Sequence, residues 1–91
     1  MQYLISYDIS SVKIRNKVVK YLESISYRVQ YSVFLTPPTR MRMDTIRRHL
    51  EMLTQGSDVR RLLIITISDS VSVPLWSNED LGIGEDRVVI V

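Results

Sequence analysis

The sequence predicts a single α+β domain in which two helices cover one face of an antiparallel sheet, the split βαβ arrangement of a ferredoxin-like sandwich. Two observations predict this class. The chain has 91 residues, which is enough for one domain. Its hydrophobic patterns follow the order strand, helix, strand, helix, strand, strand. We therefore expect residues 1–91 to form one ferredoxin-like domain with an extra C-terminal strand.

The first predicted strand covers residues 2–9 and ends on a carboxylate. The two-residue alternation of strands divides its side chains between two faces. We expect Tyr3, Ile5 and Tyr7 on one face and Leu4, Ser6 and Asp8 on the other. A polar face is unusual for a central strand, and Asp8 at its end is presented with a fixed direction.

A first helix is predicted over residues 11–25, with Ser10 or Ser11 as its N-cap. Its apolar positions recur at helical spacing, and they are Ile14, Val18, Leu22 and Ile25. Three lysines line up opposite this stripe, facing solvent or a polyanion: Lys13, Lys17 and Lys20. Arg15 falls near the edge of the stripe, where it can meet a phosphate or Asp8.

Residues 28–35 are β-branched and aromatic-rich and predict a strand. Alternation would place the polar side chains Arg28, Gln30 and Ser32 on one side of it. The predicted fold requires a hairpin here, but the segment contains no Gly or Asn turn. Either the chain bends sharply near residues 30–32, or one bent strand serves both roles.

The remaining elements are a second helix and two strands. The residues from Thr36 to Thr39 break the preceding strand and cap a helix over about residues 39–54, which Gly56 ends. Its core stripe is Met43, Ile46, Leu50 and Leu53. Residues 59–68 form an almost continuous apolar run, typical of a strand covered on both faces. Turn residues dominate from Asp69, and residues 87–91 return as a final strand.

The charged residues divide the chain into a basic body and an acidic C-terminal part. Residues 1–61 carry eleven Lys or Arg against five acids, and residues 62–91 carry one against five. A basic body indicates phosphate binding, whereas the opposite interpretation is two solvated faces. We expect residues 69–91 to form a C-terminal extension that contributes to a dimer by adding an edge strand to the other subunit.

Several classes of protein are not expected from the composition. The chain has no cysteine and one histidine, His49, so disulfide frameworks and the usual zinc sites are excluded. His49 is expected to be an exposed helix residue. The aliphatic stretches are too short to span a bilayer, and we expect a soluble, cytoplasmic protein without a membrane partner.

Asp8 is the main candidate for chemistry, and its alternative role is structural. A carboxylate at a strand end suits Mg²⁺ binding, but one carboxylate is a poor site. Two copies of Asp8 across a dimer axis would supply two ligands. The alternatives are an N-cap, an Asx-turn or a plain ion pair. No residue pattern supplies a histidine general base near it.

Other aromatic and basic residues also have two interpretations each. Tyr3, Tyr7 and Tyr31 are expected to pack in the sheet rather than stack on bases. Trp76 covers either the core or a partner. Four arginines of the second helical segment outnumber its acids and favour nonspecific duplex binding over a solvated face: Arg40, Arg42, Arg47 and Arg48.

Two segments resemble the CRISPR-associated protein 2 family: YLISYDIS at residues 3–10 and RVQYSVF at residues 28–34, with Arg15 and Lys17 between them. The resemblance covers about residues 2–54. It implies a homodimer in prokaryotic antiviral defence that bridges the CRISPR integrase during spacer acquisition. It also implies a weak or non-essential metal-dependent endonuclease, acting on RNA or double-stranded DNA.

The resemblance assigns roles to particular residues. Asp8 matches the catalytic aspartate that binds Mg²⁺ or Mn²⁺, Arg15 and Arg28 match basic positions, and Phe34 matches an aromatic position. With the basic helices, the expected nucleic-acid-binding residues are Lys13, Arg15, Lys17, Arg28, Arg40 and Arg42. The segment TPPTRMRM at 36–43 is more basic than the family pattern, and residues beyond about 69 follow none. The alternative function is a ribonuclease toxin resembling virulence-associated protein D.

Overall fold

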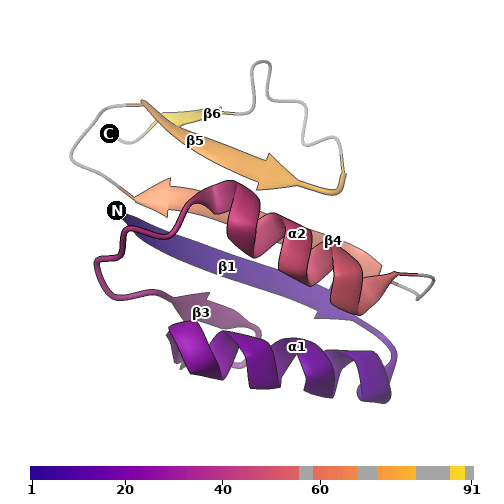
Figure 1. Cartoon of the computed structure of the whole chain (residues 1–91). Coiled ribbons are helices and arrows are strands. Elements are labelled where there is room, and N and C mark those ends of the chain that lie inside the picture. The colour runs from indigo at the N-terminus through magenta and orange to yellow at the C-terminus, as the bar shows by residue number, and fades with distance from the viewer. Residues whose placement is uncertain (56–58, 68–71, 80–86, 90–91) are drawn as a thin grey trace.

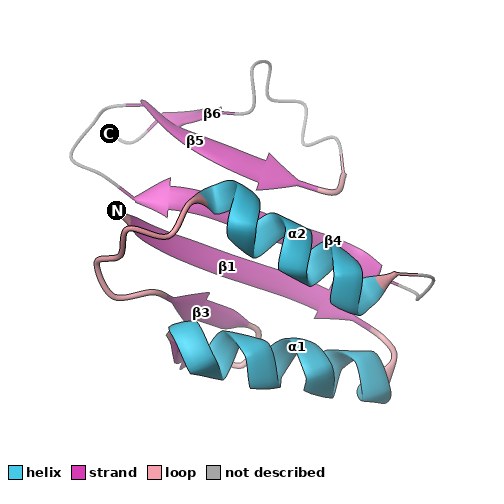
Figure 2. Ribbon diagram, viewed as in Figure 1, coloured by secondary structure: helices cyan, strands magenta, loops and turns pink. Residues whose placement is uncertain are grey.

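The computed structural model describes residues 1–55, 59–67, 72–79 and 87–89. Its sheet has the strand order β2-β3-β1-β4-β5-β6, and each neighbouring pair is antiparallel. Both helices lie on one face of this sheet (Figures 1 and 2). The strands are β1 (Gln2–Ile9), β2 (Tyr27–Gln30), β3 (Val33–Leu35), β4 (Val59–Ile67), β5 (Ser72–Ser77) and β6 (Arg87–Val89). The predicted α+β, ferredoxin-like class is confirmed.

Strand β1 lies in the middle of the sheet and follows the predicted alternation. Tyr3, Ile5, Tyr7 and Ile9 are buried under the helices, whereas Asp8 on the other face is exposed. The face without helices is called the open face below. β1 pairs with β3 on one side and β4 on the other, which fixes the direction of every side chain along it.

The segment predicted as one strand over 28–35 is a hairpin of β2 and β3, with a turn at Tyr31 and Ser32. The sharp bend is therefore the correct alternative. The turn lacks Gly and Asn because Tyr7 of β1 supports it. The backbone N–H of Tyr7 donates to the Ser32 carbonyl at 3.2 Å, and its hydroxyl donates to the Tyr31 carbonyl at 3.4 Å. Tertiary hydrogen bonds replace the usual turn signal.

Helix α1 (Val12–Ile25) begins as predicted, with Ser11 as its N-cap. The Ser11 hydroxyl accepts a hydrogen bond from the backbone N–H of Ile14 at 3.3 Å. Val18 and Leu22 of its apolar stripe are fully buried. The lysines predicted on the opposite side are exposed, and they are Lys13, Lys17 and Lys20.

Helix α2 (Met43–Thr54) begins later than predicted, at Met43 instead of about residue 39. The prediction that Thr39 caps this helix is wrong, because Thr39 is tied to the start of the chain. Its N–H donates to the Met1 carbonyl at 2.7 Å, and the Met1 amine donates to the Thr39 carbonyl at 3.1 Å. The predicted core positions Ile46 and Leu50 are fully buried. Gly56, predicted to end the helix, lies outside the described residues.

The core lies between the two helices and the covered face of the sheet. Its fully buried side chains come from three strands, β1, β3 and β4, and from both helices. They include Ile5, Leu22, Phe34, Ile46, Leu50 and Ile64. Tyr21 of α1 stacks on His49 of α2, with ring centroids 3.7 Å apart and planes at 3°. The expectation of an exposed His49 is wrong, since it is half-buried in this stack.

Strand β4 is covered by helices on one face only within this chain. Leu62, Ile64 and Thr66 are buried, whereas Leu63 and Ile65 on the open face are half-buried. The open face is also less polar than predicted. Its central positions include Leu4 and Leu35, paired across β1 and β3, and Ile65 next to Leu4. Most of these apolar side chains come from the neighbouring strands, so the residues of β1 alone do not predict the polarity of the open face.

Strand β5 was not predicted, because Pro74 and the following polar cluster indicated turns. Pro74, which has no backbone N–H to donate, lies where the partner of β5 changes from β6 to β4. Residues 75–77 pair with β4, and residues 72–74 pair with β6. Trp76 pairs with Ile64 and packs against the core, as the core-covering interpretation predicts. β6 confirms part of the final predicted strand, and Ile90 and Val91 lie outside the described residues.

Candidate nucleic-acid interface at the end of strand β1

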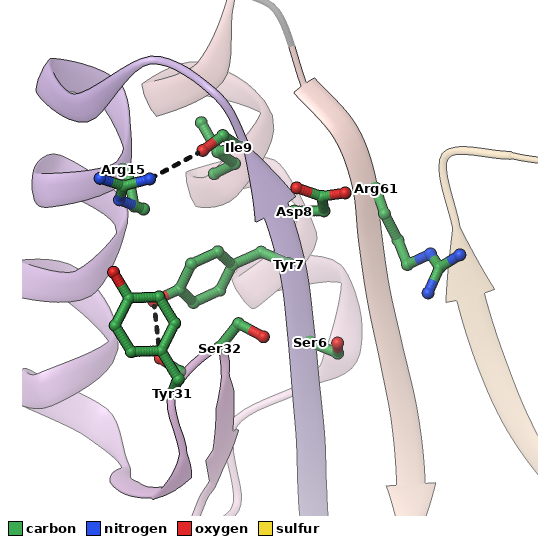
Figure 3. Close-up of a pocket in the computed structure, with 8 residues that line it drawn as sticks. All are labelled: Ser6, Tyr7, Asp8, Ile9, Arg15, Tyr31, Ser32 and Arg61. Atoms are coloured by element: carbon green, nitrogen blue, oxygen red, sulfur yellow. Dashed lines mark hydrogen bonds between the residues drawn. The ribbon is translucent and has the colours of Figure 1, made fainter.

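A cleft of about 300 Å³ lies at the C-terminal end of β1, on the side of the Tyr31–Ser32 turn (Figure 3). Four segments meet here: the end of β1, the start of α1, which follows it directly, the hairpin turn and β4. The lining residues are Ser6, Tyr7, Asp8, Ile9, Arg15, Tyr31, Ser32 and Arg61. One carboxylate, two arginine side chains and two serines therefore border one opening, and the guanidinium of Arg61 is directed away from it toward Glu79.

Asp8 is exposed at the end of β1, where the pairing with β4 shifts register between Asp8 and Ile9. Such an irregularity in the ladder re-aims side chains at a strand end. Asp8 is not the N-cap of α1, because Ser11 has that role. Among the described residues, Asp8 makes no ion pair within 4.0 Å. Two of the three structural alternatives, the helix cap and the close ion pair, therefore do not account for this carboxylate.

Arg15 lies across the cleft from Arg61 and is held by the backbone (Figure 3). Its Nη1 donates to the Ile9 carbonyl at 3.4 Å, and the side chain is half-buried. The predicted proximity of Arg15 to the end of the first strand is confirmed. A guanidinium anchored through one N–H keeps other donors available for a phosphate oxygen.

Tyr31 is 73% exposed, so the prediction that it packs in the sheet is wrong. The turn carries it out of the sheet to the rim of the cleft. Arg28 does not line the cleft. Its guanidinium carbon lies 5.1 Å from the ring centroid of Phe34 and 5.9 Å from that of Tyr31, within cation–π range.

Arg61 is the residue of the cleft that sequence reasoning missed. It pairs with Asp8 across β1 and β4, which places both side chains on the open face. Its Nε donates to Oε1 of Glu79 at 2.7 Å. That hydrogen bond, the charge of Glu79 and, less strongly, the charge of Asp8 raise the pKa of Arg61 above its usual value. Strand register, which the sequence does not reveal, brings Arg61 to Asp8.

The model of the CRISPR associated protein Cas2 family matches residues 1–72. The chain belongs to this family. The match runs from β1 through β4 and includes every residue that lines the cleft. It ends at Ser72, the first residue of β5, so Glu79 lies beyond it. A search of curated proteins found no match.

The Cas2 fold distributes the other predicted nucleic-acid-binding residues away from the cleft. Arg40 and Arg42 border a separate pocket with Met1, Tyr3 and Met41, at the opposite end of β1. Tyr3 and Asp8 are five residues apart on one strand, which corresponds to about 17 Å. Lys13 and Lys17 are exposed on α1, and Lys17 borders a groove with Tyr21 and His49. The predicted set is therefore spread over four places, since Arg15 lines the cleft and Arg28 lies on β2.

The cleft offers a single carboxylate, that of Asp8, and two arginines border the same cleft. The described residues of the chain contain no group of three or more His, Cys, Asp or Glu side chains able to hold a metal.

Within the described part of this Cas2 chain, neither helix is long and apolar enough to cross a membrane.

Proposed function

We propose that this Cas2-family chain is the homodimeric, nucleic-acid-binding subunit of the spacer-acquisition machinery and bridges the CRISPR integrase. The observation that carries the proposal is the cleft at the end of β1, where Arg15 and Arg61 flank an opening beside the basic surface of α1. Guanidinium groups bind phosphate oxygens with matching geometry.

The charges outside the cleft support binding along a duplex backbone. Lys13, Lys17 and Lys20 are exposed on α1, and Arg40 and Arg42 are exposed before and at the start of α2. Part of the arginine charge of α2 is already neutralised, because Arg47 pairs with Asp44 at 3.5 Å and Glu51 at 3.3 Å. Arg42 also lies within 4.0 Å of Asp44. Contacts of these cations with phosphates would carry no sequence information, so we expect binding to be nonspecific in sequence.

The open face of the sheet supports the homodimer. Leu4, Leu35, Leu63 and Ile65 are half-buried there. Both described helices lie on the opposite face of the sheet (Figure 1). A domain of this size gains much of its stability by burying such a face against a second copy. Pairing of these faces would also bring two Asp8 carboxylates toward one axis. The contribution of residues 69–91 to that dimer stays a prediction, since β6 pairs with β5 of its own chain.

Salt-dependent binding to a random duplex DNA, measured by fluorescence anisotropy, tests this function. Each neutralised phosphate contributes about 0.9 to the slope of log affinity against log salt. Arg15→Ala should lower that slope by about 1. Asn16→Ala, an uncharged exposed change at the next residue of α1, is the control. The proposal fails if the parent shows no salt-dependent binding and does not associate with a cognate integrase.

A second candidate function is a weak Mg²⁺- or Mn²⁺-dependent endonuclease, favoured by the exposed Asp8 carboxylate between two arginines. A metal held by Asp8 of both subunits would polarise a phosphodiester and activate water. Arg15 would orient the phosphate. Cleavage of RNA and duplex DNA by parent and Asp8→Ala proteins tests this, and equal cleavage by both rules it out. The ribonuclease-toxin hypothesis stays a prediction that toxicity on expression, relieved by a neighbouring antitoxin, would favour.

A further inference from the structure

Arg61 of β4 lies between two carboxylates, one on β1 and one just after the end of β5. Asp8 lies directly opposite it on β1, and Glu79 follows β5 on the other side. The guanidinium is bonded to Glu79, and its side chain runs from β4 away from Asp8 toward β5 (Figure 3). The pairing of β4 with β1 therefore places Arg61 beside the Asp8 cleft, whereas the hydrogen bond to Glu79 holds its guanidinium away from that cleft.

Glu79 is held in place by the residues before it. The side chain of Asn78 accepts a hydrogen bond from the Leu62 N–H at 2.7 Å, and the Asn78 N–H donates to the Leu62 carbonyl at 3.0 Å. The Glu79 N–H donates to the Ser77 hydroxyl at 3.2 Å. These bonds fix the chain after β5 against β4, one residue from Arg61. The Glu79 carboxylate is thus a positioned partner of Arg61.

We propose that Arg61 is a second phosphate-binding arm of the Asp8 cleft and that Glu79 restrains it until a nucleic-acid phosphodiester enters. The inference rests on the proposed function and adds a residue and a restraint to it. Arg15 binds the phosphate from the α1 side, and Arg61 binds it from the β4 side.

The exchange of partners is energetically accessible because the ion pair is exposed. The side chains of Arg61 and Glu79 are 53% and 40% exposed. Exposed pairs of this kind contribute little to stability. The negatively charged phosphodiesters of a nucleic acid can therefore compete with Glu79 for the guanidinium. The exchange also solves a problem of the cleft. Asp8 repels a phosphate, and a swung Arg61 would offset that charge from the adjacent strand.

Duplex binding by five single variants and one double variant tests the proposal, with the salt slope as the main readout. Arg61→Ala should weaken binding several-fold and lower the slope by about 1. Arg60→Ala is the matched control, because Arg60 is exposed on the same strand and does not line the cleft. Arg61→Lys should keep the slope and lose part of the affinity, since lysine retains the charge without the fork of donors.

The restraint is tested by Glu79→Gln against Glu51→Gln, which removes the same charge from the Arg47 ion pair. Both remove one negative charge from the protein, so both raise affinity nonspecifically. Glu79→Gln should raise it more, about threefold beyond the control. Most of that excess should vanish in the Arg61→Ala background, as a double-mutant cycle measures.

Three results would overturn the inference. Arg61→Ala and Arg60→Ala could weaken binding equally, or Glu79→Gln could match Glu51→Gln, or its excess could persist without Arg61. In each case a parent protein that still binds duplex leaves the proposed function standing. A parent that does not bind overturns both. Thermal unfolding of every variant checks that each one is folded. If Arg61→Ala is unstable, Arg61→Lys takes its place in the test.

Discussion

The ring of Tyr21 lies parallel to that of His49 at a centroid separation of 3.7 Å, and this contact joins α1 to α2 above the sheet. Both residues sit beside the buried stripes of their helices, one residue before Leu22 and Leu50 respectively. The stack therefore closes the helical layer on its outer side. It gives the single histidine of the chain a structural role that its neighbours in sequence do not suggest.

Loss of this stack should reduce stability. Aromatic pairs contribute about 1 kcal/mol beyond the area that they bury. His49→Ala should lower the free energy of unfolding by about 1 to 2 kcal/mol in urea titrations, and Arg48→Ala, exposed on the same helix, should change it by less than about 0.5 kcal/mol. Additive effects of His49→Ala and Tyr21→Leu would show that the rings do not interact.

Stability should also fall at alkaline pH because of two tyrosines, Tyr3, which is buried, and Tyr21, which is half-buried. Burial raises the pKa of Tyr3 and of Tyr21 above the usual 10.0. The folded state keeps these protons when the unfolded chain begins to lose them, so the unfolded state binds fewer protons above pH 10.0. Their contribution is complete below that pH and is lost as pH rises through the folded pKa. Tyr21→Phe should give a shallower fall in urea titrations between pH 9 and 11, and an unchanged slope would contradict the assignment.

Phe34 should be a structural residue of the family motif. Its side chain is fully buried between Tyr7, whose ring centroid is 6.3 Å away, and the guanidinium of Arg28. Phe34→Ala should destabilise the fold by about 3 to 5 kcal/mol, as large core deletions do. Tyr31→Ala, three residues earlier and 73% exposed, should change stability by less than about 0.5 kcal/mol. Equal destabilisation by the two variants in urea would contradict this division.

The open face should control association between copies of the chain. Leu63→Glu places a carboxylate beside its symmetry mate in a face that would be buried, and burying such a charge is costly. We expect it to weaken the dimer more than about tenfold, measured by light scattering over a dilution series. Met52→Glu on α2 introduces the same change at an exposed apolar residue away from the sheet. A dimer that survives Leu63→Glu as well as Met52→Glu would exclude the open face.

Local pattern was sufficient wherever one element decided the outcome. The alternation along residues 2–9 correctly separated the buried tyrosines from Asp8, and the four-residue spacing after Ser11 correctly gave the buried side of α1. In both cases the periodicity of a single element reports its burial directly. The family resemblance, which is also a local pattern, is confirmed, and the family match covers residues 1–72 rather than about residues 2–54.

Local pattern failed where contacts from elsewhere replaced the usual signals. The hairpin at residues 31–32 needs no glycine because Tyr7 bonds to both turn carbonyls. The start of α2 was misplaced because Thr39 bonds to Met1 rather than capping a helix. β5 was missed because Pro74 reads as a strand breaker unless its neighbours on both sides are known.

The sequence by itself determined the class of fold, the family and the position of Asp8 at a strand end, since each depends on residue order over a few neighbouring positions. The tertiary structure alone decided what surrounds Asp8. Arg61 meets it through the register of β1 and β4, and Glu79 reaches Arg61 through the pairing of β4 and β5. Register depends on the summed packing of whole strands, so no short segment encodes it and only the folded sheet reveals these partners.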